Sequence, residues 1–305
     1  MVKTEIRKIN TQYESRINCV LDYIEKHIEK TFTLTELAEV SGFSPFHFSR
    51  VFSGVMDETL FGYITRLKLE KAKGWLWSVP QKSITDIALD FGFNDSSEFA
   101  RAFKRTYGIS ASRYRKQSKQ SKEQNEASLY NEENSFSRSE AMDLAYNVET
   151  KKIEEMSVMY LRHVGTYAGL AKKFHPMMMK LFAYAQKHTL LNDSTKLIAV
   201  YHDNPNITAD EKRRTSVCLT IPAGTKIEGE FGQMTLDGGL YAIGHFSLDN
   251  GAQETAAWQL MFGEWLPNSG YQPGDGPVFE AYLNNPKTHP QKKHLIDIYL
   301  PIKEL

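Results

Sequence analysis

A short sequence pattern occurs twice near the N-terminus, about fifty residues apart. Residues 33–38 read TLTELA and residues 83–88 read SITDIA, so each copy has a hydroxyl residue followed three positions later by an acid. This spacing is typical of a capping box, in which the hydroxyl and the carboxylate satisfy backbone N–H groups at the start of a helix. A glycine–phenylalanine pair follows each copy, at 42–43 and 92–93, and glycine commonly ends a helix. The pattern therefore predicts two related short helices.

A second helix is predicted after each glycine turn. Residues 48–52 read FSRVF and residues 99–103 read FARAF, so the two phenylalanines of each copy lie four positions apart and share one helical face. These phenylalanines are expected to be core, which leaves Arg50 and Arg101 on exposed faces. A short helix, a glycine turn and a second helix with an exposed basic residue form the helix-turn-helix pattern. Two matched copies are stronger evidence than one, because many helical hairpins bind no DNA.

Further helices are predicted around and between the two copies. From Thr59 to Ser78, apolar residues recur near the helical period, and Pro80 follows. A helix of about 20 residues spans ~30 Å, close to one DNA turn of ~34 Å, so both second helices could enter successive segments of the major groove. Helices over residues 12–29 and 110–116 complete an expected all-α domain of seven helices, with tandem helix-turn-helix units, over residues 1–117.

Residues 13–117 resemble the DNA-binding domain of the AraC/XylS family of transcription regulators. The most specific parts are residues 84–93 (ITDIALDFGF), residues 99–105 (FARAFKR) and residues 107–115 (YGISASRYR). The family usually has a proline near Ala111, which this chain lacks, so the cap of the last helix departs from the family pattern. The resemblance implies a sequence-specific DNA-binding regulator.

The resemblance also implies which side chains face DNA. By position, the base-facing residues would be Phe46, Ser49 and Arg50 in the first unit, and Ser96, Ser97 and Arg101 in the second. An arginine can bind guanine through two hydrogen bonds, and a phenylalanine can press on a thymine methyl group. Phosphate contacts are expected from four further residues: His47, Lys104, Arg105 and Arg115. Two alternatives remain open, since Arg50 and Arg101 could lie on solvated helix faces and Phe46 could pack in the core.

The zero net charge of the chain hides an asymmetry between its halves. Residues 1–122 hold 20 Lys and Arg against 14 Asp and Glu, whereas residues 123–305 hold 17 against 23. A basic half joined to an acidic half suggests that the first half meets an anionic partner, here double-stranded DNA. A length of 305 residues favours two domains. The polar residues 118–146 between them are expected to form a mobile linker.

Several classes of protein are disfavoured by what the sequence lacks. No apolar run approaches 18 residues and the N-terminus has no apolar signal region, so we expect a cytoplasmic protein with no membrane partner. The two cysteines, Cys19 and Cys218, fall in different predicted domains, which disfavours a disulfide. No metal-binding or nucleotide-binding motif is present, so neither a metal nor a cofactor is expected.

The second half of the chain is also duplicated, with a period near 80 residues. Residues 160–165 (YLRHVG) correspond to residues 242–247 (AIGHFS), and residues 201–205 (YHDNP) correspond to residues 282–286 (YLNNP). Each half is interpreted as a strand, a helix and two strands. The prediction is an α+β domain over residues 147–305, in which one antiparallel sheet is covered by a helix from each repeat. The junction of two such repeats is a common place for a small ligand.

This half resembles the GyrI-like effector-binding domain over nearly all of residues 147–305. Four segments carry the resemblance: residues 162–167 (RHVGTY), 199–205 (AVYHDNP), 265–271 (WLPNSGY) and 279–286 (FEAYLNNP). An AraC-type module followed by such a domain resembles one-component regulators, which sense a small molecule and act on a promoter. The resemblance implies RNA polymerase and a small-molecule effector as partners.

Glu280 is the candidate ligand-binding residue of this domain. It interrupts an apolar run that is expected to be a buried strand, and its counterpart in the other repeat is Ala199. A buried carboxylate without a partner is costly, and a bound cation would offset that cost. In GyrI-like regulators the matching glutamate meets cationic, aromatic ligands, so Tyr282, Tyr160 and Trp258 could supply ring faces. Glu280 could instead pair with a Lys or Arg or lie at the sheet edge, and Tyr160 and Trp258 could be core.

Three functions remain to be weighed. The favoured one is a sequence-specific transcription regulator that acts as an activator and is not an enzyme. Its C-terminal domain is expected to bind a small cationic or aromatic effector or a protein partner. The alternative is a GyrI-like hydrolase fused to a DNA-binding domain, with Glu280 as general base. The third is a protein-binding module similar to gyrase-inhibiting relatives. The fused DNA-binding module favours the first.

Overall fold

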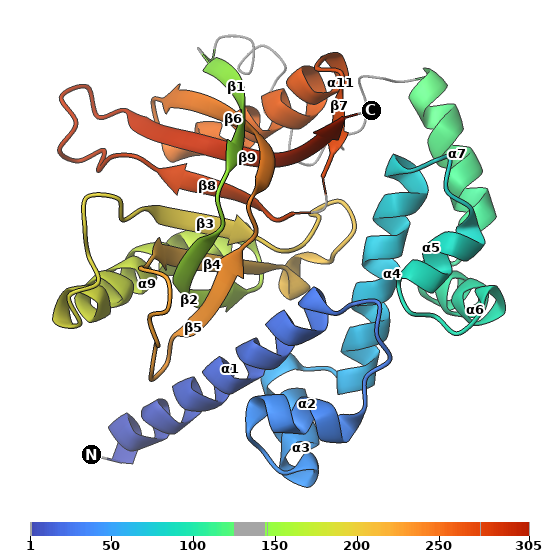
Figure 1. The fold of residues 1–305 in the computed structure, drawn as a ribbon, viewed down its shortest axis with the longest axis horizontal. Coiled ribbons are helices and arrows are strands. Elements are labelled where there is room, and N and C mark those ends of the chain that lie inside the picture. The colour runs from blue at the N-terminus through green and yellow to red at the C-terminus, as the bar shows by residue number, and fades with distance from the viewer. Residues whose placement is uncertain (1, 125–143, 145, 275, 305) are drawn as a thin grey trace. The chain divides into compact units, whose positions relative to one another are not determined.

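The computed structural model describes residues 2–124, 144, 146–274 and 276–304, and the chain divides into two compact units (Figure 1). Unit 1 holds the described residues up to 124 together with residues 228–232, and unit 2 holds the others. Most of the predicted linker, residues 125–143 and 145, lies outside the described residues. Each unit is described by itself.

Seven helices form the described part of unit 1, as the sequence predicts. They are α1 (Val2–Lys26), α2 (Leu34–Ser41), α3 (Pro45–Met56), α4 (Leu60–Ser78), α5 (Ile84–Asp90), α6 (Ser96–Tyr107) and α7 (Ala111–Gln124). The first begins ten residues before its predicted start and the last continues eight residues beyond its predicted end. Neither extension contains glycine or proline, so nothing in the sequence interrupts the helix there.

Hydroxyl caps start both short helices of the repeat. The Thr33 hydroxyl oxygen accepts a hydrogen bond from the Glu36 backbone N–H at 3.2 Å, and the Ser83 hydroxyl oxygen accepts one from Asp86 N–H at 2.9 Å. Each bond satisfies an N–H group that has no partner within its helix. The repeated pattern in the sequence is therefore a repeated helix start in the structure.

A left-handed glycine follows each short helix. Gly42 has φ +65° and Gly92 has φ +64°, a conformation that residues with a Cβ rarely adopt. A Cβ on Gly92 would also lie 2.2 Å from the carbonyl oxygen of Glu29. Conformation and close packing thus both require glycine at position 92, where the second helix-turn-helix unit makes its turn.

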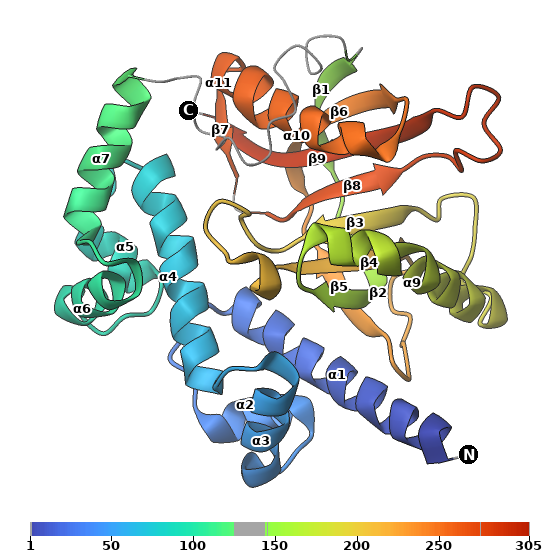
Figure 2. The same cartoon turned by 180° about the vertical axis from the view of Figure 1, so that it is seen from behind.

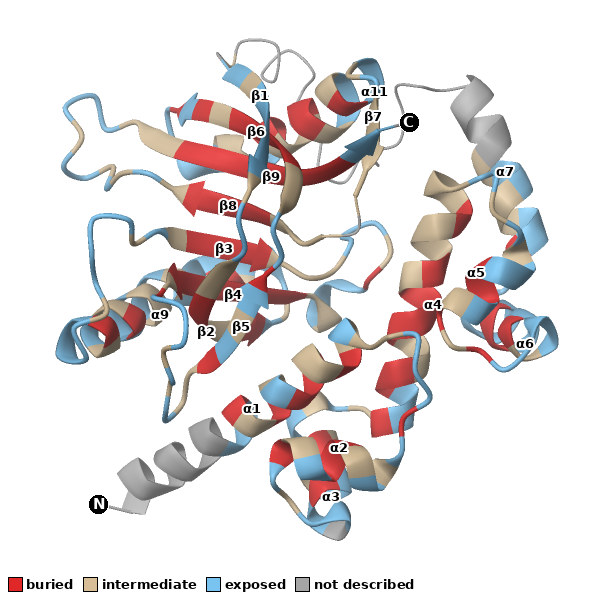
Figure 3. Cartoon of the chain, in the orientation of Figure 1, coloured by how far each residue is buried: buried red, intermediate tan, exposed pale blue. Residues whose placement is uncertain are grey.

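Helix α4 contributes to the cores of both helix-turn-helix units and is buried along much of its length (Figure 3). Its N-terminal half packs with α1, α2 and α3 through Leu60, Tyr63, Ile64 and Leu67. Its C-terminal half packs with α5, α6 and α7 through Leu69, Ala72 and Leu76. Because one rigid helix belongs to both cores, it fixes the position of one helix-turn-helix unit relative to the other within unit 1.

Polar side chains of α4 add further ties. Lys68 is only 6% exposed, and its Nζ donates hydrogen bonds to the carbonyl oxygens of Lys30 at 2.8 Å and Gly92 at 2.9 Å. Burial lowers the pKa of this ammonium group. Lys30 precedes α2 and Gly92 follows α5, so one side chain joins the backbones of both helix-turn-helix units.

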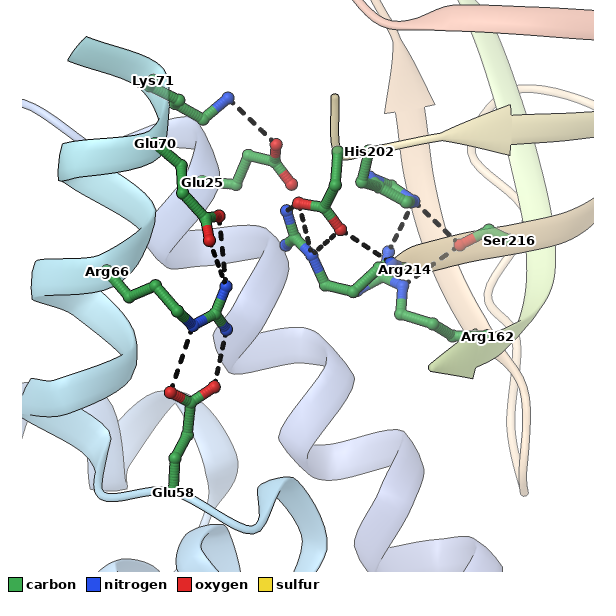
Figure 4. Close-up of polar contacts among 10 residues, drawn as sticks. Glu25, Glu58, Arg66, Glu70, Lys71, Arg162, His202, Arg214 and Ser216 are labelled. Carbon is green, nitrogen blue, oxygen red and sulfur yellow. Dashed lines mark hydrogen bonds and ion pairs between the residues drawn. The ribbon is translucent and has the colours of Figure 1, made fainter. Parts of the chain in front are cut away.

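Helix α4 also carries ion pairs. Figure 4 shows Arg66 between two carboxylates, with Nη2 2.6 Å from Glu58 Oε1 and Nη1 3.1 Å from Glu70 Oε1. Lys71 pairs with Glu25 of α1 at 3.1 Å. These groups are part-buried, so solvent screens them less than it screens a fully exposed pair.

Unit 2 contains one antiparallel sheet, as the repeat predicts. Its strands are β1 (Tyr146–Ile153), β2 (Met156–Val164), β3 (Leu197–Tyr201), β4 (Arg214–Thr220), β5 (Gly232–Leu236), β6 (Gly239–Leu248), β7 (Tyr271–Pro273), β8 (Val278–Tyr282) and β9 (His294–Glu304). They follow the order β1-β6-β9-β8-β3-β4-β2-β5, and β7 pairs with β9. Three of these strands, β1, β5 and β7, were not predicted from the sequence.

The two repeats meet in the middle of the sheet, where β3 pairs with β8. Each predicted repeat is preceded by an extra strand, β1 before β2 and β5 before β6. Both extra strands cross to the other repeat, because β1 pairs with β6 and β5 lies beside β2. This exchange joins the repeats into a single sheet.

The two faces of the sheet differ. Figure 2 shows α9 (Tyr167–Lys187), α10 (Glu254–Gln259) and α11 (Leu266–Asn268) over one face. The π-helical turn η4 (Leu260–Trp265) joins α10 to α11. The other face holds a separate apolar cluster that includes Tyr160, Phe279 and Tyr299. None of the helices in the described part of the chain combines the length and apolar character needed to cross a membrane.

A polar cluster lies on β2, β4 and the end of β3. Figure 4 shows Arg162 beside His202 and Ser216, with Arg162 Nε 3.1 Å from Ser216 Oγ and His202 Nε2 2.9 Å from that oxygen. Nearby, the buried Arg214 forms an ion pair with Asp203 at 2.6 Å. Asp203 also accepts a hydrogen bond from the Arg214 backbone N–H, so this pair anchors the chain that leaves β3.

Candidate nucleic-acid interface and buried carboxylate site

Helix α3 separates an apolar face from a polar one. Phe48 and Phe52 are fully buried, with ring centroids 5.8 Å apart. Three of the predicted DNA-facing residues of α3 are exposed: His47, Ser49 and Arg50. Phe46 belongs to the same helix, but its side chain lies outside the described part of the structure. The exposed groups include donors and acceptors that can reach base edges or phosphates.

Helix α6 repeats this arrangement. Its inner face buries Phe99 and Phe103, and its first turn is capped by Asp95, which accepts a hydrogen bond from the Glu98 N–H at 2.7 Å. The predicted DNA-facing residues of α6 are all exposed: Ser96, Ser97, Arg101, Lys104 and Arg105. The structure therefore brings a hydroxyl-rich start and a basic end onto one exposed helix.

Arg115 of α7 differs from the expected phosphate contact. Its side chain is half-buried, and Nη1 donates a hydrogen bond to the Lys82 carbonyl oxygen at 2.8 Å. Burial lowers the pKa of this guanidinium group. The side chain therefore joins α7 to the start of the second helix-turn-helix unit, whereas the preceding arginine, Arg113, is exposed. Sequence position alone could not separate these two arginines.

Glu280 lies at the centre of the unit 2 sheet. Its strand, β8, has β3 on one side and β9 on the other, and its Cα partners are Ala199 and Ile298. The side chain is fully buried. The alternative that Glu280 lies at the sheet edge is therefore wrong. Ala199, the repeat counterpart, is its direct neighbour, so the pseudo-symmetric repeats place an acid and a methyl group side by side.

Three aromatic side chains donate hydrogen bonds to the Glu280 carboxylate. Oε2 accepts from the Tyr201 hydroxyl at 3.0 Å and from the Tyr282 hydroxyl at 2.9 Å, and Oε1 accepts from the Trp258 indole N–H. Tyr201 and Tyr282 are repeat counterparts, so each repeat supplies one hydroxyl. Trp258 comes from α10. These three bonds fix the carboxylate without an ion pair to Lys or Arg among them.

A second layer of rings surrounds these donors. It is supplied by α9 and η4 and consists of Tyr167, Phe174 and Phe262. The Tyr167 ring lies 5.8 Å from that of Tyr201, and the Phe174 ring lies 5.2 Å from that of Tyr282. The Tyr201 and Trp258 rings are 5.6 Å apart and edge to face. Aromatic rings from the sheet, α9, α10 and η4 thus surround the carboxylate.

Tyr160 does not join this group, contrary to the expectation from the sequence. It is fully buried in the cluster that contains Phe279, the residue next to Glu280. Neighbouring residues of a strand point to opposite faces, so Tyr160 and Glu280 lie on opposite faces of the sheet. The sequence places both residues on strands but does not specify the register that separates them.

Burial dominates the ionisation of the site. It raises the pKa of Glu280, and the hydrogen bonds from Trp258, Tyr282 and Tyr201 oppose that shift. Burial and then the charge of Glu280 raise the pKa of Glu254 on α10 to about 8. The pKa values of both tyrosines are raised well above 10, so their hydroxyls keep their protons and act as donors.

Several residues of the site were missed in the sequence. Tyr201 could have been found, because it occupies the repeat position of Tyr282. Phe174, Phe262 and Glu254 lie on helices, where no sequence signal indicates which residues face Glu280. Among the described residues, no group of three or more His, Cys, Asp or Glu side chains is placed to hold a metal ion.

Comparisons with known proteins agree with this division into two units. The GyrI-like small molecule binding domain matches residues 146–303, and a helix-turn-helix domain matches residues 37–117. A DNA gyrase inhibitor of Edwardsiella piscicida is 31% identical over 159 residues, which cover 50% of this chain and 97% of that protein. The probable transcriptional regulator LumQ of Photobacterium leiognathi is 33% identical over 116 residues, 37% of this chain and 46% of that protein.

Solved structures include a similar domain. The crystal structure of the EcmrR C-terminal domain aligns with a TM-score of 0.44 and 17% identity, covering 52% of this chain and 99% of that domain. The family assignment depends on the matched domains, which together span most of the described chain. The chain belongs to the GyrI-like small molecule binding family, and it joins this domain to an AraC-type helix-turn-helix domain as a DNA-binding transcription regulator.

Proposed function

We propose that unit 2 binds a small cationic, aromatic effector at Glu280 and that unit 1 recognises promoter DNA through α3 and α6. The observation that carries the effector proposal is the fully buried Glu280 carboxylate, whose three hydrogen-bond donors are all aromatic side chains. A buried negative charge attracts a cation, and the electron-rich faces of the surrounding rings do so as well.

The same contacts favour binding over catalysis. A general base must reach a water molecule or a substrate proton. Both oxygens of Glu280 already accept hydrogen bonds, and these bonds hold the carboxylate at the sheet centre. This arrangement suits a fixed charge better than a proton acceptor, and it supports the regulator over the hydrolase alternative.

The effector proposal is tested with a permanently charged aromatic probe, benzyltrimethylammonium, and a neutral aromatic control, N-benzylacetamide. Binding to the full chain is followed by tryptophan fluorescence and calorimetry at pH 8.5. The pKa of Glu280 is raised, so a larger fraction of its carboxyl group is ionised at this pH than at neutral pH. We expect the cation to bind the full chain and the Glu280→Gln variant to bind it at least ~10-fold more weakly, because the neutral amide lacks the negative charge.

The matched control is Glu264→Gln, which makes the same change at an exposed acid of η4. It is expected to leave cation binding unchanged. Equal affinity for the cation and the neutral probe, or equal affinity of wild type and Glu280→Gln, would contradict the proposal. A circular dichroism spectrum confirms that both variants are folded.

The DNA contacts proposed for unit 1 follow from exposure and position. By position and exposure we assign base contacts to Ser49, Arg50, Ser96, Ser97 and Arg101, and phosphate contacts to His47, Lys104 and Arg105. Phe46 is assigned a base contact by its position alone. Arg115 is omitted because its side chain bonds to the Lys82 carbonyl.

We further propose that the chain activates transcription by contacting RNA polymerase while bound to the promoter. Transcription in vitro from a bound promoter tests this proposal.

A second candidate function has one observation in its favour. The chain is similar to a DNA gyrase inhibitor of Edwardsiella piscicida over 159 residues, which cover 97% of that protein. A contact between unit 2 and a type II topoisomerase is therefore the alternative to a small-molecule effector. Inhibition of gyrase supercoiling by the full chain at stoichiometric concentration, together with no binding of the aromatic cation, would favour this alternative.

A further inference from the structure

A second carboxyl group faces the same site from α10. Glu254 lies four residues before Trp258, and side chains at this spacing share a helical face. Trp258 donates a hydrogen bond to Glu280, so this face of α10 is directed toward the buried carboxylate. The Glu254 side chain is half-buried, and its charge acts on Tyr201 and Tyr282, the two other donors to Glu280. Glu254 therefore belongs to the surroundings of Glu280.

The two carboxyl groups disfavour each other's ionisation. Burial is the larger cause and the neighbouring charge of Glu280 the second, and together they raise the pKa of Glu254 to about 8. The titratable groups that act on this site are Glu280, Tyr201 and Tyr282 of the sheet and Tyr167 of α9. The pKa values of the three tyrosines are raised, so they remain neutral. At neutral pH the pair thus retains a proton. A second positive charge on a ligand could replace that proton.

We propose that the site selects a ligand with two positive centres, and that Glu254 is the residue that sets this preference. This inference rests on the proposed effector site at Glu280. One cationic centre pairs with Glu280 and the other with Glu254, while the apolar part between them lies against Trp258. The Trp258 ring is 5.6 Å from that of Tyr201 and stacks 5.9 Å from that of Phe262, so it belongs to a continuous aromatic surface.

An organic dication fits this chemistry better than a metal ion. A divalent metal such as Ca²⁺ or Mg²⁺ requires six or more oxygen ligands, including water. Here the groups around the two carboxyls are aromatic rings, whose faces attract ammonium and other organic cations. The expected ligand class is a bis-ammonium or diamine compound with an aromatic or short apolar spacer.

The test compares a dication with a monocation of related structure. Calorimetry at pH 8.5 measures binding of 1,4-bis(trimethylammoniomethyl)benzene and of benzyltrimethylammonium to the full chain. We expect the dication to bind at least ~10-fold more tightly, a preference that corresponds to ~1.4 kcal/mol. In Glu254→Gln this preference should fall below about threefold.

Two further variants make the assignment specific. Glu264→Gln removes an exposed acid from the following helical turn and should retain the preference for the dication. Glu254→Asp retains the charge and should keep part of that preference, which a purely structural role of Glu254 would not predict. Thermal melting checks that each variant is folded.

A pH series supplies an independent readout. If the dication displaces the proton of Glu254, the ratio of dication to monocation affinity should decrease below about pH 8, by at most tenfold per pH unit for one released proton. In Glu254→Gln this ratio should not depend on pH. Using the ratio removes the titration of Glu280, because both cations engage that residue.

The outcomes separate the two proposals. If the monocation binds through Glu280 but the dication binds no more tightly, or if Glu254→Gln leaves the preference intact, the dication inference is overturned and the effector site at Glu280 stands. If neither cation binds, the effector proposal fails and the dication inference fails with it.

Discussion

Arg50 and Lys104 are exposed on different recognition helices, and their side chains differ in what they can read. The planar guanidinium of Arg50 can make two parallel hydrogen bonds to guanine, whereas the ammonium group of Lys104 acts as a point charge. A point charge interacts well with a phosphate, and phosphates are the same at every sequence. The two residues are therefore expected to contribute to different properties of DNA binding.

This difference gives a prediction at the residue scale. On a site recovered by genome-wide mapping, Arg50→Ala should weaken specific binding by ~1–3 kcal/mol and relax base preference at one position. Lys104→Ala should weaken binding to specific and random DNA alike and lower the slope of log K against log salt by about 1. Fluorescence anisotropy titrations over a range of salt concentrations measure both effects. Equal losses on specific and random DNA for Arg50→Ala would contradict its assignment as a base contact.

Individual residues also show where sequence reasoning stops. Glu280 was recognised because an acid in an apolar strand is unusual, and burial confirms its unusual environment. Tyr160 has the aromatic ring expected of a ligand contact, but it lies in the apolar cluster on the other face of the sheet. Arg115 has the charge expected of a phosphate contact, but it bonds to the Lys82 carbonyl oxygen. Strand register and helix packing decide which way such side chains point. These depend on contacts between segments far apart in the chain, which a single sequence does not specify. Residue type is thus more predictable than residue direction.

At the scale of elements, α4 unites the two helix-turn-helix units. Lys68 is the polar centre of this contact, because its ammonium group joins carbonyl oxygens that precede α2 and follow α5. One helical turn away, Lys71 forms a more exposed ion pair with Glu25. The two lysines belong to the same helix and differ in burial, so they form a matched pair for substitution.

We expect Lys68→Met to lower the free energy of unfolding of unit 1 by about 1–3 kcal/mol, because it leaves two carbonyl oxygens at a part-buried contact without their donor. Lys71→Met removes a partly exposed ion pair and should cost less than about 1 kcal/mol. Urea denaturation followed by the helical circular dichroism signal measures both changes. Similar effects of the two substitutions would show that Lys68 does not have the structural role assigned to it.

The elements that were predicted and those that were missed differ in physical character. Caps, glycine turns and helical periodicity are local signals, and they located α2 to α6 closely. Strand β1 was missed because it is mostly exposed and polar, with little apolar alternation. Strand β5 alternates but is only five residues long, too short for a clear signal. Strand β7 is only three residues long. Edge strands form through pairing with a partner strand, and their own residues do not indicate which strand that is.

Each of the two units contains an internal duplication, and the two copies are more alike in their functional residues in unit 1 than in unit 2. In unit 1 both copies keep the same parts, an exposed helix over a phenylalanine core. In unit 2 the copies are alike in fold, but Glu280 faces Ala199 across the strand pair, so only one copy supplies the buried acid. Duplication was visible in the sequence in both cases. The single asymmetric position is what turns a repeated fold into a candidate site.

The repeat in unit 1 also predicts how the chain meets DNA. Helix α4 has 19 residues and a length of ~28 Å, near the ~34 Å of one DNA turn, and its two halves belong to the two cores. Because this spacer is rigid, one chain should contact two adjacent half-sites at a fixed distance. Binding of a single chain to one site can be checked by light scattering of the complex.

Changing the distance between the half-sites therefore tests the whole arrangement. Inserting five base pairs between them turns the second half-site to the opposite side of the DNA, and we expect affinity to fall by at least ~10-fold, because α6 can no longer reach it. The same insertion outside the site should have no effect. A ten-base-pair insertion restores the side of the helix but adds ~34 Å, which a rigid α4 cannot span, so affinity should remain low. If the ten-base-pair insertion restored binding, the two half-sites would have to be read by separate chains.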